Sequence, residues 1–221
     1  MPAPPPGEPP LLVGIAGGSG SGKTTLSRAL AAALDPARVA LLSHDAYYRD
    51  RSALAPAARA ALDYDVPDAF DQPLFLAHLT ALRAGAAVEP PSYCFVTHRR
   101  VGVSSAVAPR PIVLIEGILL LCDPVVRAAL DLGIFLRAPE RLRLQRRIER
   151  DTLERGRTVE SVLAQFRATV RPAHAQWVEP SQERADLVLS TAGPIEPLAE
   201  IAARVITDRL ARRAAFRRGA A

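Results

Sequence analysis

The feature that most constrains this 221-residue chain is a glycine-rich segment near its start. Residues 17–24 read GGSGSGKT, which matches the pattern G-x-x-x-x-G-K-[S/T]. An apolar stretch precedes the segment and an amphipathic stretch follows it, as in a strand–loop–helix unit. In such a unit the backbone N–H groups of the loop surround an anion at the start of the helix. The segment therefore predicts a phosphate-binding loop, with an ordinary glycine-rich turn as the alternative.

Lysine usage also favours a phosphate-binding loop. The chain has 28 basic residues, and Lys23 is the only lysine among them. A compact ammonium group on a thin stem fits a phosphate cradle that a planar guanidinium would not fit. We expect Lys23 to reach the β- and γ-phosphates of a nucleoside triphosphate and Thr24 to coordinate Mg²⁺. The expected nucleotide site comprises Gly17, Gly18, Ser19, Gly20, Ser21, Gly22, Lys23, Thr24 and Thr25.

The same lysine count argues against one class of nucleotide-binding protein. GTPases usually recognise guanine with an Asn-Lys-x-Asp motif, and here the single lysine already belongs to the loop. A bound hydroxyl group is therefore favoured over water as the acceptor of the phosphoryl group.

Apolar segments alternate with helical ones along the chain. Strands are expected at 11–16, 39–43, 112–115, 133–136 and 185–190, with an irregular hairpin at 88–107. Helices are expected from the loop to about residue 34, at 51–63, 74–83, from 139 onward, at 159–178 and at 197–213. This alternation predicts an α/β fold of the P-loop NTPase type, with helices on both faces of a central parallel sheet.

The domain organisation expected is simple. A single kinase domain spans residues 11–210, with an arginine-rich helical lid at about 139–158 and a small hairpin that serves the substrate. Residues 1–10, which hold six prolines, are expected to be disordered, and residues 211–221 form a basic tail.

The positive net charge of +5 is concentrated in two places. Residues 137–157 contain eight arginines and four acidic residues, and residues 209–221 contain five arginines and no acidic residue. We interpret the tail as a solvated, frayed end and expect no nucleic-acid partner. No apolar stretch reaches the roughly 20 residues of a membrane span, and the N-terminus does not resemble a signal peptide. With only Cys94 and Cys122, we expect a soluble cytoplasmic protein with reduced thiols and no membrane partner.

Two acidic residues follow expected strands. Asp45 comes just after the strand at 39–43, and Glu116 directly follows the strand at 112–115. Because the carboxyl ends of parallel strands meet at one edge of a sheet, these carboxylates should converge beside Gly17. A helix cap or turn is the alternative for Asp45, and a structural loop cap is the alternative for Glu116.

Six segments resemble the uridine kinase, or uridine–cytidine kinase, branch of the phosphoribulokinase/uridine kinase family. They are SHDAYY (43–48), YDVPDAFD (64–71), PSYCFVTHRR (91–100), EGIL (116–119), RRIERD with RGR (146–157), and VRP with EP (170–180). The resemblance covers about residues 11–191 and is specific, because phosphoribulokinase relatives share the loop but lack the segment from Tyr93 to His98. Cys94 departs from the pattern, in which an aspartate is frequent.

The resemblance implies roles for individual residues. It assigns catalysis to Asp45 and Lys23, nucleoside binding to Tyr48, Asp65, Tyr93, His98, Arg147, Arg157 and Gln165, phosphate contacts in the lid to Arg150 and Arg155, and Mg²⁺ coordination to Thr24 and Glu116. An ionised Asp65 can only accept hydrogen bonds, which suits two vicinal ribose hydroxyls. Neutral His98 can donate to uracil O4 or accept from the cytosine N4 amine by changing tautomer. Solvated side chains are the alternative for His98 and the lid arginines, and we expect Arg141 and Arg143 to form only surface pairs.

The leading hypothesis is therefore an enzyme that phosphorylates the 5′-hydroxyl of uridine and cytidine. It would use ATP or GTP with Mg²⁺ and yield UMP and CMP for pyrimidine salvage. The alternatives are a phosphoribulokinase-like or pantothenate kinase-like enzyme for another small hydroxylated metabolite, and a regulatory or nucleic-acid protein that uses ATP as a switch. The resemblance also implies a homo-oligomer, expected to be a tetramer.

Overall fold

A computed structural model describes residues 8–219 of the chain; of the proline-rich start predicted to be disordered, residues 1–7 lie outside this range. The centre of the fold is a five-stranded parallel sheet with strand order β2-β5-β1-β6-β7. Its strands are β1 (Leu11–Gly17), β2 (Val39–Ser43), β5 (Ile112–Glu116), β6 (Leu132–Arg137) and β7 (Leu187–Ser190). The predicted α/β class with a parallel sheet is confirmed.

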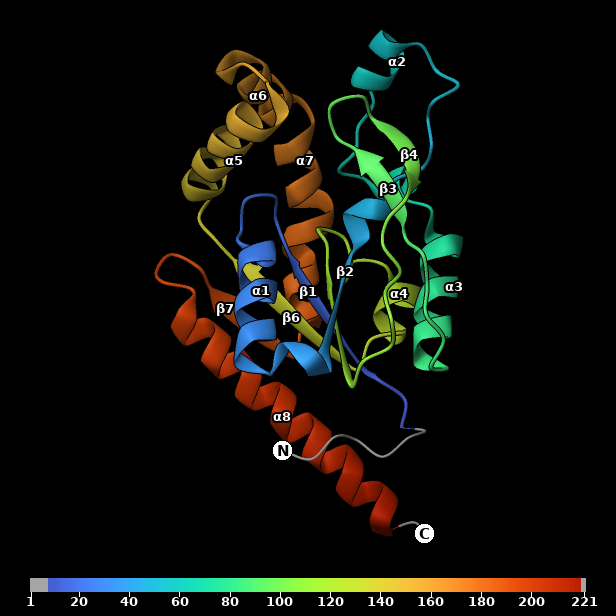
Figure 1. The fold of residues 1–221 in the computed structure, drawn as a ribbon. Helices are drawn as coiled ribbons and strands as arrows, with labels where there is room; N and C mark the ends of the chain where they lie inside the picture. Colours follow the sequence, from blue (N-terminus) through green and yellow to red (C-terminus); the bar gives the residue numbers. More distant parts are fainter. Residues whose placement is uncertain (1–7, 220–221) are drawn as a thin grey trace.

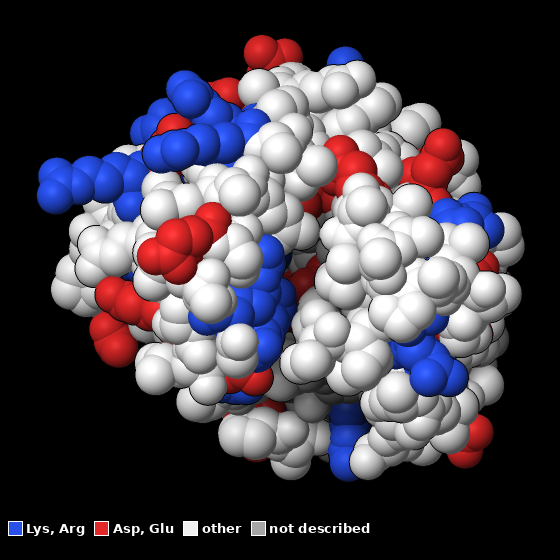
Figure 2. Space-filling view, turned by 90° about the horizontal axis from the view of Figure 1, so that it is seen from above, with Lys and Arg blue, Asp and Glu red and all other residues white. Residues whose placement is uncertain are grey.

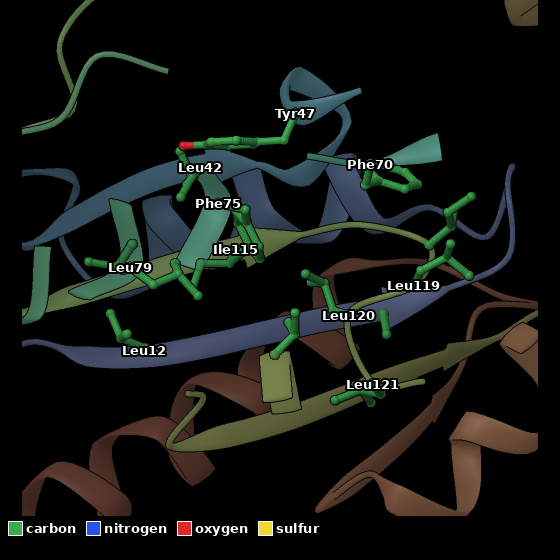
Figure 3. Packing of buried hydrophobic residues seen from close by; sticks show 14 of the residues in the cluster. Leu12, Leu42, Tyr47, Phe70, Phe75, Leu79, Ile115, Leu119, Leu120 and Leu121 are labelled. Carbon is green, nitrogen blue, oxygen red and sulfur yellow. The ribbon is translucent and has the colours of Figure 1, made fainter. Parts of the chain in front are cut away.

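Helices cover both faces of this sheet (Figure 1). The α-helices of the described chain are α1 (Lys23–Ala33), α2 (Pro56–Ala60), α3 (Gln72–Arg83), α4 (Pro124–Ala128), α5 (Glu140–Arg155), α6 (Val159–Gln165), α7 (Arg171–Ala173) and α8 (Glu196–Gly219), and not all of them lie on the sheet. Alternate residues of each strand point to opposite faces, which produces two cores. One core packs the sheet against α1 and α8, and the other against α3 and the segment after β2. Figure 3 shows the second core, where Phe75 and Leu79 lie near Leu12 and Ile115, and Phe70 lies farther along in the same cluster.

The strand registers bring the expected polar residues to one edge of the sheet. Ile15 on β1 is paired with Glu116 on β5, and Ser43 on β2 is paired with the same residue. Gly17 ends β1 opposite Leu136 of β6. The phosphate loop and the carboxylate at the end of β5 therefore share the carboxyl edge of the sheet, as predicted.

Two groups of elements rise above this edge on opposite sides. Figure 1 shows α5 and α6 on one side, and α2 with the hairpin of β3 (Pro91–Cys94) and β4 (Arg99–Val103) on the other. The hairpin is antiparallel, with an irregularity between Ser92 and Tyr93 and a further bridge from Val88 to Val107. The predicted irregular hairpin and the basic helix are confirmed.

Three expected helices differ from those in the structure. The helix predicted at 51–63 contracts to α2, because Pro56 fixes its first turn and the carbonyl groups of Ser52 and Leu54 bind the Arg59 side chain instead. The helix predicted at 159–178 contains two π-helical turns, at Phe166–Val170 and His174–Val178. Helix α8 continues to Gly219, beyond the end predicted at residue 213, so residues 211–219 of the predicted basic tail are helical.

Candidate active site

The loop between β1 and α1 wraps around the only lysine of the chain. The Lys23 ammonium group donates to the carbonyl oxygens of Gly17 at 2.9 Å and Gly18 at 3.1 Å. Burial lowers the pKa of Lys23, while the nearby charges of Glu116 and Asp45 act in the opposite direction. Thr24 and Thr25 lie exposed in the first turn of α1, where their hydroxyl groups are accessible.

The same loop packs directly against the basic helix α5. A side chain at Gly20 would place its Cβ 2.3 Å from the Arg143 carbonyl oxygen, so only glycine allows this close approach. Arg147 donates to the Ser19 hydroxyl at 2.9 Å, and Arg146 donates to the Thr191 carbonyl at 3.1 Å. The phosphate loop and the lid helix are therefore in direct contact at residues 19–20.

Arg143 lies in this contact, which corrects the prediction of a surface pair. It is only 4% exposed, and its Nε donates to the Ala138 carbonyl at 3.3 Å. The reason is that the first turns of α5 face the loop, so the Arg143 side chain is enclosed between Gly18 and helical residues near His174. Arg141, two residues before Arg143 in the sequence, is exposed, as predicted.

A pair of carboxylates lies beside the loop. Glu116 accepts a hydrogen bond from the Ser43 hydroxyl at 2.9 Å, whereas Oδ1 of Asp45 is shielded from solvent and has no hydrogen-bond partner. Burial, together with the negative charge of Glu116, raises the pKa of Asp45 to about 6, although Lys23 opposes this shift. An unpartnered, buried carboxylate oxygen next to a second carboxylate is an environment that favours a cation.

These oxygen ligands suit Mg²⁺. The ion prefers hard oxygen ligands and usually takes one or two carboxylates together with water and phosphate oxygens. Glu116, Asp45 and the Thr24 hydroxyl supply such oxygens at the sheet edge. Within residues 8–219, no group of three or more histidine, cysteine, aspartate or glutamate side chains forms a metal site by itself. The residues present therefore fit an ion that is bound jointly with a phosphate chain.

A pocket opens between the lid and the hairpin. Seen from above in Figure 2, it is a groove with basic side chains on its lid wall and acidic side chains deeper inside. Its lining combines eleven site residues predicted from the sequence with three aromatic or apolar side chains. The predicted residues are Ser19, Asp45, Tyr48, Asp65, Tyr93, His98, Arg147, Arg150, Arg155, Arg157 and Gln165, and the others are Tyr64, Phe95 and Ile118. Glu116 and Thr24 do not line this pocket. Ile118 was not expected from the sequence.

Aromatic rings line the hairpin side of the pocket. The Tyr64 ring stacks on His98 with 4.4 Å between centroids, and Tyr48 lies against Tyr93 at 5.0 Å. The Tyr93 hydroxyl lies 3.4 Å from Nδ1 of His98, which adopts a left-handed backbone conformation at φ 51°. Burial, and then the positive charges of Arg157 and Arg155, lower the pKa of His98, so its imidazole is neutral near pH 7.

Two arginines that were not predicted from the sequence, the buried Arg59 and the half-buried Arg100, hold this wall in place. Arg59 bonds to the Thr97 carbonyl at 3.1 Å, beside His98. Arg100 bonds to the Tyr48 carbonyl at 2.9 Å and pairs with Asp71 at 3.1 Å. Asp71 also caps α3, where its side chain accepts from the Leu74 N–H. The adjacent Arg99 in the hairpin was a signal for Arg100, whereas the sequence around Arg59 in α2 offered none.

Asp65 lies at the base of the pocket and is 8% exposed. Burial raises the pKa of its carboxyl group, and the positive charge of Arg147 opposes that rise. Arg147 in turn donates to Oε1 of Gln165 at 3.0 Å, and Arg157 donates to the same oxygen. The side chains from the segment before α3, from α5 and from α6 therefore converge on one volume.

Comparisons with known proteins agree with this geometry. Residues 12–195 match the model of the phosphoribulokinase / uridine kinase family. The chain belongs to this family. A protein from Chloroflexus aggregans, named uridine kinase, is 44% identical over 184 residues, which are 83% of this chain and 88% of that protein. The expected family, and with it a kinase enzyme, are confirmed.

Solved structures show the same fold. A putative fructose transport system kinase from Silicibacter sp. TM1040 superimposes with a TM-score of 0.68 at 26% identity and covers 84% of this chain and 92% of its own. A possible uridine kinase from Bacillus stearothermophilus gives 0.60 at 20% identity, with 82% and 89% covered. The fold of this family member is therefore that of P-loop kinases. Each helix in the described part of the chain is too short or too polar to cross a lipid bilayer.

Proposed function

We propose that this kinase phosphorylates the 5′-hydroxyl of uridine and cytidine, using ATP or GTP with Mg²⁺, and that it serves cytoplasmic pyrimidine salvage. The observation that carries the proposal is the composition of the pocket between the lid and the hairpin. It joins Asp45 and the loop serine at one end with Asp65 and a tyrosine–histidine wall at the other. A flat base and a ribose fit the aromatic end, and a sugar phosphate alone would leave that wall without a partner.

Base recognition is assigned to the hairpin. Neutral His98 offers one donor and one acceptor, and its contact with the Tyr93 hydroxyl orients the ring. A change of tautomer lets the same side chain donate to uracil O4 or accept from the N4 amine of cytosine. Tyr48 and Tyr64 supply flat surfaces for the base, and the ionised Asp65 accepts from the two ribose hydroxyls.

Asp45 is assigned the role of general base, which accepts the proton of the acceptor hydroxyl. With a pKa of about 6, its carboxylate is mostly ionised at neutral pH but basic enough to accept a proton. The 5′-oxygen forms a bond to the γ-phosphorus while the bond to the β,γ-bridging oxygen breaks, and the hydroxyl proton moves to Asp45. Lys23 and the lid arginines neutralise charge on the transferred group.

Thr24 and Glu116, with Asp45 nearby, are the residues that would hold Mg²⁺. When bound, the ion neutralises phosphate charge. The carboxylates of this chain orient the acceptor hydroxyl at the same edge of the sheet. The tetramer implied by the resemblance stays a prediction, which the mass of the protein in solution tests.

The experiment that tests the nucleoside assignment compares two histidine variants. His98→Ala should raise the KM for uridine and cytidine strongly and leave the KM for ATP near the wild-type value. His78→Ala is the control, because His78 lies outside the pocket and contacts Tyr47. An unchanged KM for uridine in His98→Ala would exclude pyrimidine recognition by this wall and favour a kinase for another hydroxylated metabolite.

A further inference from the structure

One acidic side chain of the lid has a role that the proposed chemistry does not use. Asp151 on α5 is fully buried, and four arginines lie within ion-pair distance of its carboxylate. Its Oδ1 accepts from Arg150 at 2.8 and 2.9 Å and lies 3.2 Å from Arg155. Its Oδ2 lies 3.5 Å from Arg147 and 3.6 Å from Arg157. Each carboxylate oxygen therefore lies within ion-pair distance of two guanidinium groups.

The backbone of the same residue fixes the turn that follows the helix. The Asp151 carbonyl accepts from the N–H groups of Gly156 and Arg157, the latter at 3.1 Å. Gly156 takes the left-handed conformation, with φ at 63°, that closes the helix. Asp151 thus contacts both the helical arginines and the one beyond the turn.

The Asp151 carboxylate offsets the repulsion among the four arginines that surround it. Four guanidinium groups gathered in one place repel one another, and that repulsion is strong where water is excluded. In the described part of the chain, their other direct side-chain contacts are with neutral groups: the Ser19 and Ser161 hydroxyls, the Gln165 amide and the Phe95 ring. Asp151 is therefore the buried carboxylate that lies within ion-pair distance of all four arginines, while Asp45 and Asp65 act on some of them only through longer-range attraction.

The arginines held by Asp151 point into the pocket. All four line it, and the Arg155 guanidinium lies 4.2 Å from the centre of the Phe95 ring on the opposite hairpin. The four arginines thereby line the same pocket as Asp45. Such preorganised donors stabilise a transferring phosphoryl group without having to reorganise during the reaction.

We propose that Asp151 is a positioning residue for phosphoryl transfer, acting through Arg147, Arg150, Arg155 and Arg157. This inference rests on the proposed function, because it assumes that the arginines meet the phosphoryl group or the nucleoside. Asp151 itself touches neither, since its side chain is buried behind them. The proposal accounts for the aspartate of the RRIERD segment, which the charge pattern alone does not explain.

The test compares Asp151→Asn with Glu154→Gln. Both substitutions remove one negative charge from α5, but Glu154 is exposed and contacts none of the four arginines. We expect kcat for uridine phosphorylation to fall at least about tenfold in Asp151→Asn, since a misplacement of about 1 Å can cost a hundredfold. Amide exchange over residues 151–157 of the ligand-free protein should quicken as well. Glu154→Gln should match the wild type in both measurements.

Two further variants distinguish a positioning role of Asp151 from a general loss of structure. In an Arg150→Ala background, Asp151→Asn should reduce kcat by a smaller factor than in the wild type, because the two residues act in series. Asp151→Glu keeps the charge and should recover part of the amide protection. Equal factors in the two backgrounds would show a merely structural role and overturn the proposal.

Failure of this inference differs from failure of the proposed function. If the wild type phosphorylates uridine and Asp151→Asn retains its kcat, Asp151 does not position the arginines for the reaction. If the wild type fails to phosphorylate uridine, the proposed function is wrong. The amide-exchange comparison still tests whether Asp151 orders residues 151–157 of the lid. Equal amide exchange in Asp151→Asn and Glu154→Gln would overturn the role of Asp151 in either case.

Discussion

The contact between the phosphate loop and the lid helix can be tested with a pair of glycine substitutions. Gly20 has φ at 78° and lies against the Arg143 backbone, whereas Gly85, just after α3, has φ at 85° and nothing within 4 Å of a Cβ. Alanine in the left-handed region costs about 1–2 kcal/mol at either position. The effect of alanine on the unfolded chain is the same at both positions and cancels in the comparison.

Only Gly20→Ala also meets a steric obstacle. Its Cβ would lie 2.3 Å from the Arg143 carbonyl oxygen, against a lower limit of 3.0 Å for real contacts, so the loop or helix must shift by about 0.7 Å. Overpacking of this kind adds about 1–3 kcal/mol. We therefore expect a loss of roughly 2–5 kcal/mol in the free energy of unfolding for Gly20→Ala, against about 1–2 kcal/mol for Gly85→Ala.

The assays are urea unfolding and steady-state kinetics with ATP as the varied substrate. Because the shift moves Ser19 away from Arg147, kcat/KM for ATP should fall at least about tenfold in Gly20→Ala and stay at the wild-type value in Gly85→Ala. Equal losses of unfolding free energy in the two variants, with equal activity, would refute the close docking of the loop on α5.

Three further predictions follow from the site and its surroundings. Asp45→Asn should keep ATP affinity but lose at least about a hundredfold in kcat, measured at saturating uridine, and an unchanged kcat would require another base. Asp65→Ala should raise the KM for uridine more than that for 2′-deoxyuridine; equal increases would contradict its ribose contact. Burial lowers the pKa of His44 to about 4, so the folded state binds fewer protons than the unfolded state, and stability should decline by up to about 3 kcal/mol between pH 6.5 and 4. His44→Gln should flatten that decline in unfolding experiments, and an equally steep decline in the variant would contradict the prediction.

Much of the sheet and its loop could be predicted from the sequence, because short apolar runs and the GGSGSGKT segment are local signals. The five predicted strands all exist, with ends shifted by at most two residues. The predicted helix at 51–63 failed because its many alanines favour a helix locally, while the tertiary contacts of Arg59 divert the preceding carbonyl groups. Local propensity was overridden there by a buried polar contact.

The buried charges of the site were the least predictable part. Sequence spacing placed Arg147 and Arg150 on one helical face, but it could not show that Arg143 would be covered by the loop. Asp151 stands four residues from both Arg147 and Arg155, a spacing that also fits exposed surface pairs. Its burial arises only when the turn at Gly156 brings Arg157 back beside the helix. That information lies in three-dimensional packing and not in the period of the sequence.

The most direct measurement of the central claim is an analysis of products with a panel of acceptors. Purified protein is incubated with ATP and Mg²⁺ and with uridine, cytidine, adenosine, pantothenate or ribulose 5-phosphate, beside Lys23→Ala as the inactive control. We predict UMP and CMP as the products of the wild type and no product with Lys23→Ala. Phosphorylation of pantothenate or ribulose 5-phosphate in preference to the pyrimidine nucleosides would contradict the proposed function.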